Sequence, residues 1–576
     1  IYQNEALFKR IEAIYTGEEL KSLTAEQQRL VWLKYKDFVL NGAKLNAKDK
    51  AQLASINQKL ASLFTRFSQN KLGDEGEKHI AINNKEDLKG LSDEWINAAA
   101  EAAEQRGLKG KWIVSNTRSS VDPFLTYADN RALREQVWTM FTNIGDNADK
   151  FDNNAIIPEI LQLRAQRAKL LGYPTHAHWR LDNTMAKTPE NAMKLMESVW
   201  EPAKKLVARE VKDMQAIADK EGVKISIQPW DYKYYAEKVR KAKYDLDQNE
   251  IKPYMQLEKL REGMFWVAGK VFGLGFEAVT DVPVFHEDVR VWKVFQLVDN
   301  KFIGLWYFDP YARKGKRSGA WMTDYRAQSN IGGKYIATIV SNNSNFVKGK
   351  PGDPVLISWD DAETLFHEFG HALHGLCSDV TYPSVSGTNV PQDYVEFPSQ
   401  ILERWLATPE VLQNYALHHQ TGEPIPLALV EKINNAAKFN QGFYTVEALA
   451  AAIVDMKLHL ADPNTVEADA FERKTLQEIG MPKEIAMRHR LPHFSHIFSG
   501  DEYSAGYYSY LWADVISADA YEAFLEASGP YDEQVAARLK QYVFGIGNAI
   551  DPEIAYIKYR GKAPDSKALM LTRGLL

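Results

Sequence analysis

The sequence predicts a mainly α-helical protein of two lobes, with a small β-sheet inserted just before a cluster of histidines. Three observations support this prediction. Most of the chain carries apolar residues at helical spacing, one interval between residues 291 and 340 is strand-like, and 576 residues are too many for one hydrophobic core. We expect a helical lobe over residues 1–245 and a second lobe, which carries the histidines, over residues 246–576; either lobe can be discontinuous.

The clearest helix signals lie in the first half of the chain. Thr188 suits an N-cap and Pro189 suits the first helical turn, so a helix is expected from there to about Gly222. An earlier helix is predicted by apolar residues at helical spacing, which are Leu53, Ile56, Leu60, Leu63 and Phe64.

The small sheet is predicted from three strand-like runs. Residues 291–298 and 302–309 are separated by Asp299–Lys301, which is the pattern of a β-hairpin. Residues 334–340 are a further strand candidate. These strands come shortly before the histidine cluster, so the sheet is expected to lie beside it.

Composition and charge exclude two classes of function. A net charge of -6 offers no basic excess for nucleic acid, and the best apolar run, Ala448–Val454, is far too short for a membrane span. The single cysteine, Cys377, excludes an intramolecular disulfide and fits a cytoplasmic location. Because the chain begins at Ile1 and not at Met, we expect N-terminal residues to be missing, and a removed signal peptide would make the location periplasmic.

A short apolar segment, TLFHEFGHALHG at residues 364–375, holds three of the 13 histidines. Asp360 and Glu363 form a pair like a capping box, which predicts a helix beginning just before the segment. At about 100° per residue, the histidines then fall on one narrow stripe, and apolar residues cover the opposite side. Such a helix packs its apolar side on a core and presents imidazoles to a cleft.

His367, Glu368 and His371 form the motif HExxH. Two imidazoles one turn apart can bind one zinc ion, and the glutamate can act as the general base. The alternative, two surface histidines with ordinary hydrogen bonds, is disfavoured because capping, helical phase and the polar stripe agree. His374 is nearly in phase, but one straight helix cannot place three imidazoles around a tetrahedral ion. We expect His374 to line the wall or to lie behind the ligands.

Catalytic zinc needs a third protein ligand and one open position. Glu396 is the best candidate, because no glutamate occurs between His371 and Val395. Glu403 lies two helical turns later on the same face, either as an outer partner of a ligand or as an ordinary salt-bridge residue.

Several motifs resemble the thimet oligopeptidase family of zinc peptidases. The most specific are the histidine segment, SGTNV at residues 386–390 and DYVEFPSQ at residues 393–400. The resemblance extends from about residue 120 to the end, through MAKTPE (185–190), KPYMQL (252–257), DPYARKGKRSGAW (309–321) and FSHIFSGDEYSAGYYSYLW (494–512). Within the family, FSHIF and GYYSYLW are most similar to the bacterial peptidyl-dipeptidase branch.

The resemblance implies an almost entirely helical fold in which two lobes flank a deep central channel, with zinc on its floor. It implies that His367, His371 and Glu396 bind one zinc ion and that Glu368 is the base. It also implies that the site is lined by His496, Tyr503 and Tyr510, one of the tyrosines donating to the oxyanion. Ser499, Gly500, Ser504 and Gly506 predict that the tyrosine segment is a flexible loop.

We therefore expect a monomeric zinc peptidyl-dipeptidase that removes C-terminal dipeptides from short unfolded peptides. An endo-acting oligopeptidase of the same family is the first alternative. A catalytically inactive peptide-binding protein is the second, but such a protein would be expected to lack Glu368 or a ligand. Donors available for a substrate carboxylate are the tyrosines of residues 503–510 and Arg488, His489, Arg490 and His493.

Overall fold

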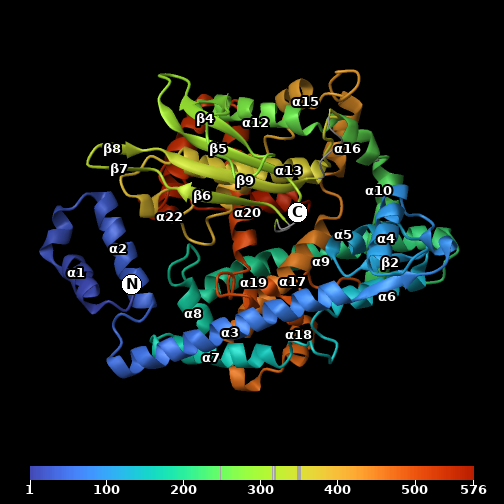
Figure 1. Ribbon diagram of the computed structural model, residues 1–576, viewed down its shortest axis with the longest axis horizontal. Helices are drawn as coiled ribbons and strands as arrows, with labels where there is room; N and C mark the ends of the chain where they lie inside the picture. Colours follow the sequence, from blue (N-terminus) through green and yellow to red (C-terminus); the bar gives the residue numbers. More distant parts are fainter. Residues whose placement is uncertain (247, 314–315, 317–318, 347–351) are drawn as a thin grey trace.

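Two hydrophobic cores organise the chain, and each lies in one of the two lobes of the computed structural model (Figure 1). The structure describes residues 1–246, 248–313, 316, 319–346 and 352–576. The core of the lower lobe in Figure 1 takes its residues from segments 56–239 and 443–575. The core of the upper lobe takes Met185 and residues from segments 246–433 and 516–559. Both cores use the C-terminal half of the chain, and the division at residue 245 stays a prediction.

The lower lobe is built from long helices. α9 begins after the predicted N-cap, Thr188, whose side chain accepts a hydrogen bond from the Asn191 N–H. The helices of this lobe are α3 (Ala47–Glu77), α7 (Ile156–Leu170), α8 (His176–Leu181), α9 (Pro189–Lys220), α10 (Pro229–Tyr244), α17 (Gln441–Leu460), α18 (Ala468–Glu478), α19 (Ser495–Phe498) and α23 (Lys567–Thr572). The two helices predicted from the sequence are thus confirmed as α3 and α9.

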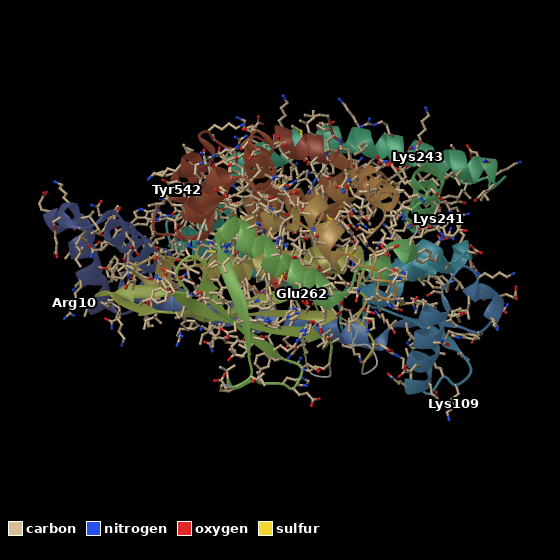
Figure 2. All side chains as sticks on the ribbon, turned by 90° about the horizontal axis from the view of Figure 1, so that it is seen from above. Arg10, Lys109, Lys241, Lys243, Glu262 and Tyr542 are labelled. Atoms are coloured by element: carbon tan, nitrogen blue, oxygen red, sulfur yellow. The ribbon has the colours of Figure 1, made fainter. Side chains whose placement is uncertain are left out.

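Smaller units lie at the two ends of the long axis. One is the helical hairpin of α1 (Glu5–Thr16) and α2 (Ala25–Leu40); the other has its own core and consists of β1 (His79–Ile82), α4 (Asp93–Gln105), β2 (Trp112–Ser115), α5 (Arg118–Tyr127) and α6 (Arg131–Thr142). In the view from above, Arg10 on α1 and Lys109 between α4 and β2 mark these opposite ends (Figure 2). Among the described residues, no helix combines the length and apolar character that a membrane crossing needs.

The upper lobe combines helices with a five-stranded sheet of order β3-β4-β5-β9-β6. Its strands are β3 (Leu274–Val279), β4 (Arg290–Gln296), β5 (Phe302–Tyr311), β6 (Trp321–Arg326) and β9 (Thr338–Phe346). Its helices are α11 (Gln248–Ile251), α12 (Leu257–Phe272), α13 (Trp359–Leu376), α14 (Phe397–Glu403), α15 (Pro409–Tyr415), α16 (Leu427–Ala436), α21 (Glu533–Leu539) and α22 (Pro552–Arg560). α20 (Ser509–Leu525) contributes residues to both cores.

The predicted hairpin is confirmed, because β4 and β5 pair antiparallel. The predicted strand at 334–340 is instead divided. Residues 334–336 form β8, which pairs with β7 (Ser329–Ile331) across a glycine turn, and β9 begins only at Thr338. The polar run SNNSN within β9 gave no strand signal, yet those side chains are mostly buried.

α13 is the predicted histidine helix, but it begins two residues earlier than expected. The Ser358 hydroxyl accepts from the Asp361 N–H (3.0 Å), and the Asp361 carboxylate accepts from the Ser358 N–H (3.1 Å). The predicted capping pair, Asp360 and Glu363, is therefore wrong. Both residues lie inside the helix, and Glu363 accepts from Trp359 Nε1 instead (2.9 Å).

One buried carboxylate joins the lobes beside the histidine helix. Asp393 accepts from the N–H groups of Met185 and Ala186 (2.9 Å each) and from the Tyr508 hydroxyl (2.9 Å). The segments MAKTPE and DYVEFPSQ, far apart in the sequence, therefore meet at this residue.

Candidate active site

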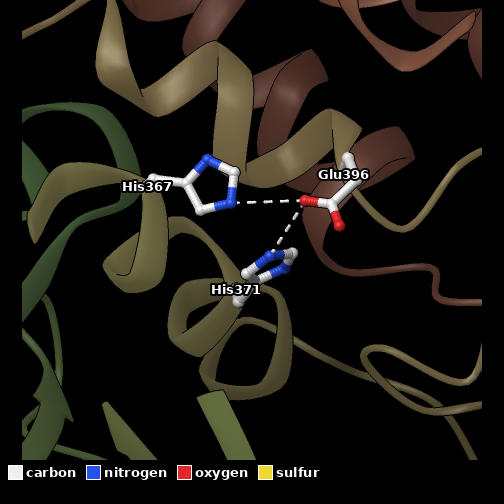
Figure 3. Close-up of side chains that lie close together, drawn as sticks. All are labelled: His367, His371 and Glu396. Atoms are coloured by element: carbon white, nitrogen blue, oxygen red, sulfur yellow. Dashed lines mark ion pairs between the residues drawn. The ribbon is translucent and has the colours of Figure 1, made fainter. Parts of the chain in front are cut away.

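Three side chains from two helices converge on one point of the upper lobe (Figure 3). Glu396 Oε2 lies 3.3 Å from His367 Nε2 and 3.2 Å from His371 Nε2. Four ligand atoms arranged as a tetrahedron at about 2.0–2.1 Å from one ion are roughly 3.3–3.4 Å apart. The donor set and its spacing therefore fit a tetrahedral metal ion with one position left open.

A glycine lets the two helices approach closely enough to form this cluster. A Cβ atom on Gly370 of α13 would lie 2.5 Å from the Pro398 carbonyl oxygen and 2.6 Å from Ser399 Cα, both in the first turn of α14. Glu396 is the N-cap residue of α14, so the position of that helix also fixes its carboxylate. The glycine of the motif HEFGH, Gly370, thus leaves room for α14 to pack against α13.

We expect Gly370→Ala to weaken metal binding at least about tenfold, because overpacking costs about 1–3 kcal/mol and here moves the helix of Glu396 away from the histidines. The measurement is a competition between the protein and a chelator for added zinc. Gly76→Ala is the matched control, since a Cβ there meets nothing within 4 Å. Unchanged affinity in Gly370→Ala would show that α14 does not need this close approach.

The electrostatics of the cluster favour a cation. Burial raises the pKa of Glu396, but hydrogen bonds and charge from His367 and His371 outweigh it and hold that pKa well below its usual range. Burial lowers the pKa of His367, whereas hydrogen bonds to Glu396 and Glu403 raise it well above its usual value. The carboxylates therefore stabilise positive charge between these atoms, as a metal site requires.

Glu403 lies behind His367. Its Oε1 is 2.6 Å from His367 Nδ1. A carboxylate on the second ring nitrogen of a metal-binding histidine fixes the tautomer and orientation of the ring. Of the two readings of Glu403, the structure supports the outer partner of a ligand.

Glu368 lies on the same helix and interacts electrostatically with His367, His371 and Glu396, but it does not belong to the cluster. Its side chain is buried and Oε2 has no hydrogen-bond partner, while its backbone carbonyl accepts from Asn342 Nδ2 of β9 (2.6 Å). Burial raises the pKa of Glu368, with His371 and His367 acting in the opposite direction. A carboxylate with a free oxygen and a raised pKa is suited to accept a proton.

His374 is not part of the cluster. It is fully buried against Tyr394 and Phe544, and burial lowers its pKa to about 3, so the ring is neutral. Of the two positions expected for His374, the wall and the region behind the ligands, this burial agrees with the second.

The predicted aromatic residues form a second cluster, contributed by the lower lobe. The rings of Tyr503 and Tyr510 are parallel with centroids 5.6 Å apart, and His496 lies 5.6 Å from Tyr503 and 6.5 Å from Tyr510. Burial is the main cause that raises the pKa of both tyrosines, and the charge of Glu396 adds to it. Both hydroxyls are therefore neutral and can donate hydrogen bonds, and both interact electrostatically with Glu396 of the histidine–glutamate cluster.

A cavity of about 400 Å³ adjoins these aromatic residues. It is lined by His496 and Tyr510 of the aromatic cluster, by the neighbouring Tyr507, by Gln400 of α14 and by Arg488. Arg488 Nη1 lies 3.2 Å from Glu447 Oε2, and Glu447 holds the pKa of Arg488 above its usual value although burial lowers it. A permanent cation therefore faces the cavity.

Of the other three proposed donors, one lines the same cavity and two do not. His489 also lines this cavity. Arg490 is engaged by Asp146, Asp469 and Glu472, and His493 is buried with Nε2 accepting from the Arg490 N–H. Sequence reasoning missed three residues that tertiary packing brings to the site. Gln400 lines the cavity, Glu447 pairs with Arg488, and Asn342 donates to the Glu368 carbonyl. The only local signal was the position of Gln400 one turn after Glu396.

The fold, the HExxH helix and the nearby glutamate define a metallopeptidase. A family model described as peptidase family M3 matches residues 124–575, and the chain belongs to this family. The chain is 40% identical over 582 residues to a dipeptidyl carboxypeptidase of Escherichia coli, covering 100% of this chain and 84% of that one. It is 33% identical over 588 residues to an oligopeptidase A of Salmonella typhimurium, covering 100% and 85%. The family resemblance of the motifs is thus confirmed.

Solved structures show the same fold at low sequence identity. PZ peptidase A with an inhibitor matches with a TM-score of 0.56 at 15% identity, covering 99% of this chain and 82% of that one. A structure described as a putative oligoendopeptidase F matches with a TM-score of 0.57 at 16% identity, with the same coverage. The prediction of a mainly helical fold is therefore confirmed.

Proposed function

We propose that the chain is a zinc-dependent dipeptidyl carboxypeptidase that hydrolyses the peptide bond two residues before a free C-terminus. The observation that carries this proposal is how the two lobes contribute to the site. The upper lobe provides the cluster of His367, His371 and Glu396 with the free carboxylate of Glu368, and the lower lobe provides neutral tyrosine hydroxyls and a cavity lined by Arg488. The predictions of a monomer and of a cytoplasmic location stay predictions.

His367 Nε2, His371 Nε2 and Glu396 Oε2 would hold the zinc ion. Bound there, zinc would supply an activated water and polarise the carbonyl of the bond to be cut. Glu403 fixes the ring of His367, and Ser399 Oγ, 3.2 Å from Glu396 Oε2, holds that carboxylate in place. These residues keep the ligand atoms oriented before substrate arrives.

Glu368 would carry the proton. Its free Oε2 takes a proton from the attacking water and then gives it to the nitrogen of the leaving amine. Both proton transfers use the Glu368 carboxylate. Its raised pKa helps it to accept the proton from water, and the protonated form can then donate to the amine. The alternative of an inactive binding protein is disfavoured, because Glu368 is present and His367, His371 and Glu396 lie together as the proposed ligand set requires.

Tyr510, with Tyr503 beside it, would donate a hydrogen bond to the oxyanion that forms on the cut carbonyl. We expect Tyr510→Phe to lower kcat roughly 100-fold or more with little change in KM, because an oxyanion donor acts mainly in the transition state. Steady-state kinetics on a defined peptide measures this. Tyr542→Phe is the control, because Tyr542 is a half-buried tyrosine that belongs neither to the histidine cluster nor to the aromatic cluster. A change below threefold would return Tyr510 to a packing role.

Arg488 would bind the C-terminal carboxylate of the substrate and so select dipeptide release. Amidating the C-terminus of a peptide should lower cleavage roughly 10- to 100-fold, since a charge-assisted hydrogen bond contributes about 1.5–3 kcal/mol. Acetylating the N-terminus of the same peptide should change the rate little. Product ends are identified by mass spectrometry.

Equal cleavage of the free-acid and amidated peptides, with cuts inside the chain, would assign an endo-acting oligopeptidase instead. Arg488→Gln separates the two readings further. In a dipeptidyl carboxypeptidase it removes the preference for the free acid, whereas in an endopeptidase it leaves the ratio of the two rates unchanged.

A further inference from the structure

The segment that carries the catalytic tyrosines is held by buried side chains, although its glycines and serines predict a flexible loop. Arg164 of α7 is fully buried and donates to the carbonyls of Ile497 (2.7 Å) and Gly500 (2.8 Å). Arg180 donates to the Glu502 carbonyl (2.7 Å). The entry to the tyrosine turn, which we define as residues 503–507, is therefore fixed from behind.

Asp455 of α17 holds the turn itself. One carboxylate oxygen accepts from the Ala505 N–H (2.9 Å) and the other from the Tyr507 N–H (3.0 Å), while the Gly506 N–H closes the turn on the Tyr503 carbonyl (2.8 Å). Ala505 has a φ of 53°, a left-handed conformation that alanine rarely adopts. Such a conformation persists only where surrounding contacts fix it, and Asp455 supplies two of them.

This turn sets the relative position of the two proposed oxyanion donors. Tyr503 is the first residue of the turn, and Tyr510 is the second residue of α20, three residues after the turn ends; their rings are parallel to within 5°. A change in the turn would therefore move one hydroxyl relative to the other.

Asp455 is itself held by a buried histidine and arginine. Its Oδ1 lies 2.9 Å from His459 Nδ1, and His459 Nε2 lies 3.0 Å from Arg164 Nη1. All three residues are buried. Because a guanidinium nitrogen can only donate, His459 Nε2 accepts from Arg164, and the ring proton lies on Nδ1, where it faces the carboxylate and the backbone carbonyl of Asp455 (2.9 Å each). The buried carboxylate is thus hydrogen-bonded, and the charge of Arg164 lies behind the imidazole.

We propose that Asp455 is a positioning residue for peptide hydrolysis: by fixing the N–H groups of Ala505 and Tyr507, it aims the hydroxyls of Tyr503 and Tyr510 at the reacting carbonyl. The inference rests on the proposed function of these tyrosines. Asp455 does not touch the substrate, so its effect must pass through them.

The test is Asp455→Asn, which keeps the shape but turns an NH₂ group toward one of the two backbone N–H donors. We expect kcat to fall roughly 10- to 100-fold, as a misplacement of about 1 Å can cost, with KM changed less than about threefold. In a Tyr503→Phe/Tyr510→Phe background the same substitution should lower kcat less than about twofold, because the groups that it positions are gone.

Asp74→Asn is the matched control. Asp74 is a fully buried carboxylate of the same lobe that accepts from Asn147 Nδ2 and Lys78 Nζ (2.9 Å each). It should lower Tm comparably and leave kcat unchanged. If Asp455→Asn does not fold, His459→Asn removes the partner of Asp455 and should give the same pattern at roughly 3- to 10-fold.

Equal losses of kcat in the two backgrounds would overturn the proposal and make Asp455 a purely structural residue. A crystal structure of the folded Asp455→Asn variant with the turn and both tyrosine rings unmoved would overturn it as well, whatever the activity. A wild-type protein that binds zinc but cuts no peptide would instead refute the proposed function, and the crystallographic comparison would still decide whether Asp455 positions the rings.

Discussion

Replacing Glu368 by glutamine is expected to lower kcat by about three orders of magnitude or more, while zinc content and peptide affinity stay near those of the wild type. The amide keeps the size of the side chain but cannot accept the proton of the attacking water. General-base catalysis alone is worth about 10²–10⁴-fold, and the same carboxylate is also proposed to deliver the proton to the leaving amine.

The geometry makes this variant a clean test. Glu368 Oε2 has no partner, so the substitution breaks no hydrogen bond of that atom, and the cluster of His367, His371 and Glu396 does not include it. Single-turnover kinetics measures the chemical step, and calorimetry with an uncut peptide measures binding. Glu363→Gln, five residues earlier on the same helix, is the control and should keep at least a third of the rate. A Glu368→Gln enzyme with more than about a tenth of wild-type kcat would mean that another residue is the base.

The histidine helix was predictable because its information is local. The spacing of His367 and His371 places both imidazoles on one face, and the two residues remain on that face whatever surrounds the helix. The start of the helix was less predictable. Ser358, Asp360 and Asp361 are all plausible N-terminal residues, and only the backbone conformation shows that Ser358 is the cap.

The third ligand candidate was predictable by elimination, but its position was not. Glu396 is the first glutamate after the motif, which the sequence reveals, whereas its distance from the histidines depends on Gly370 packing against Pro398 and Ser399. The glycine is visible in the sequence, but its partner surface is not.

The aromatic side of the site could be named from the resemblance, yet its rigidity could not. Glycine and serine indicate freedom when only the local sequence is considered. The residues that remove this freedom, Arg164 and Asp455, lie some 50 to 340 residues away from their partners in the chain. Buried polar contacts of that kind leave no periodic signal, which is also why the polar run of β9, residues 341–345, was missed.

Glu396→Ala is expected to weaken zinc binding by about three orders of magnitude or more, and to abolish peptide cleavage at ordinary zinc concentrations. Loss of a residue behind a ligand costs about 10- to 100-fold in metal affinity, and loss of one of three ligands must cost more. The remaining pair, His367 and His371, would also lose the negative charge that stabilises a cation between them.

The measurement is metal analysis after dialysis, with affinity determined by chelator competition. Glu403→Ala is the matched comparison, because Glu403 contacts the outer nitrogen of His367 and does not belong to the three-residue cluster; this substitution should cost about 10- to 100-fold in zinc affinity. The order of the two effects distinguishes a ligand from its support. Full zinc occupancy and unchanged affinity in Glu396→Ala would remove Glu396 from the ligand set, and a larger loss in Glu403→Ala would exchange the two roles.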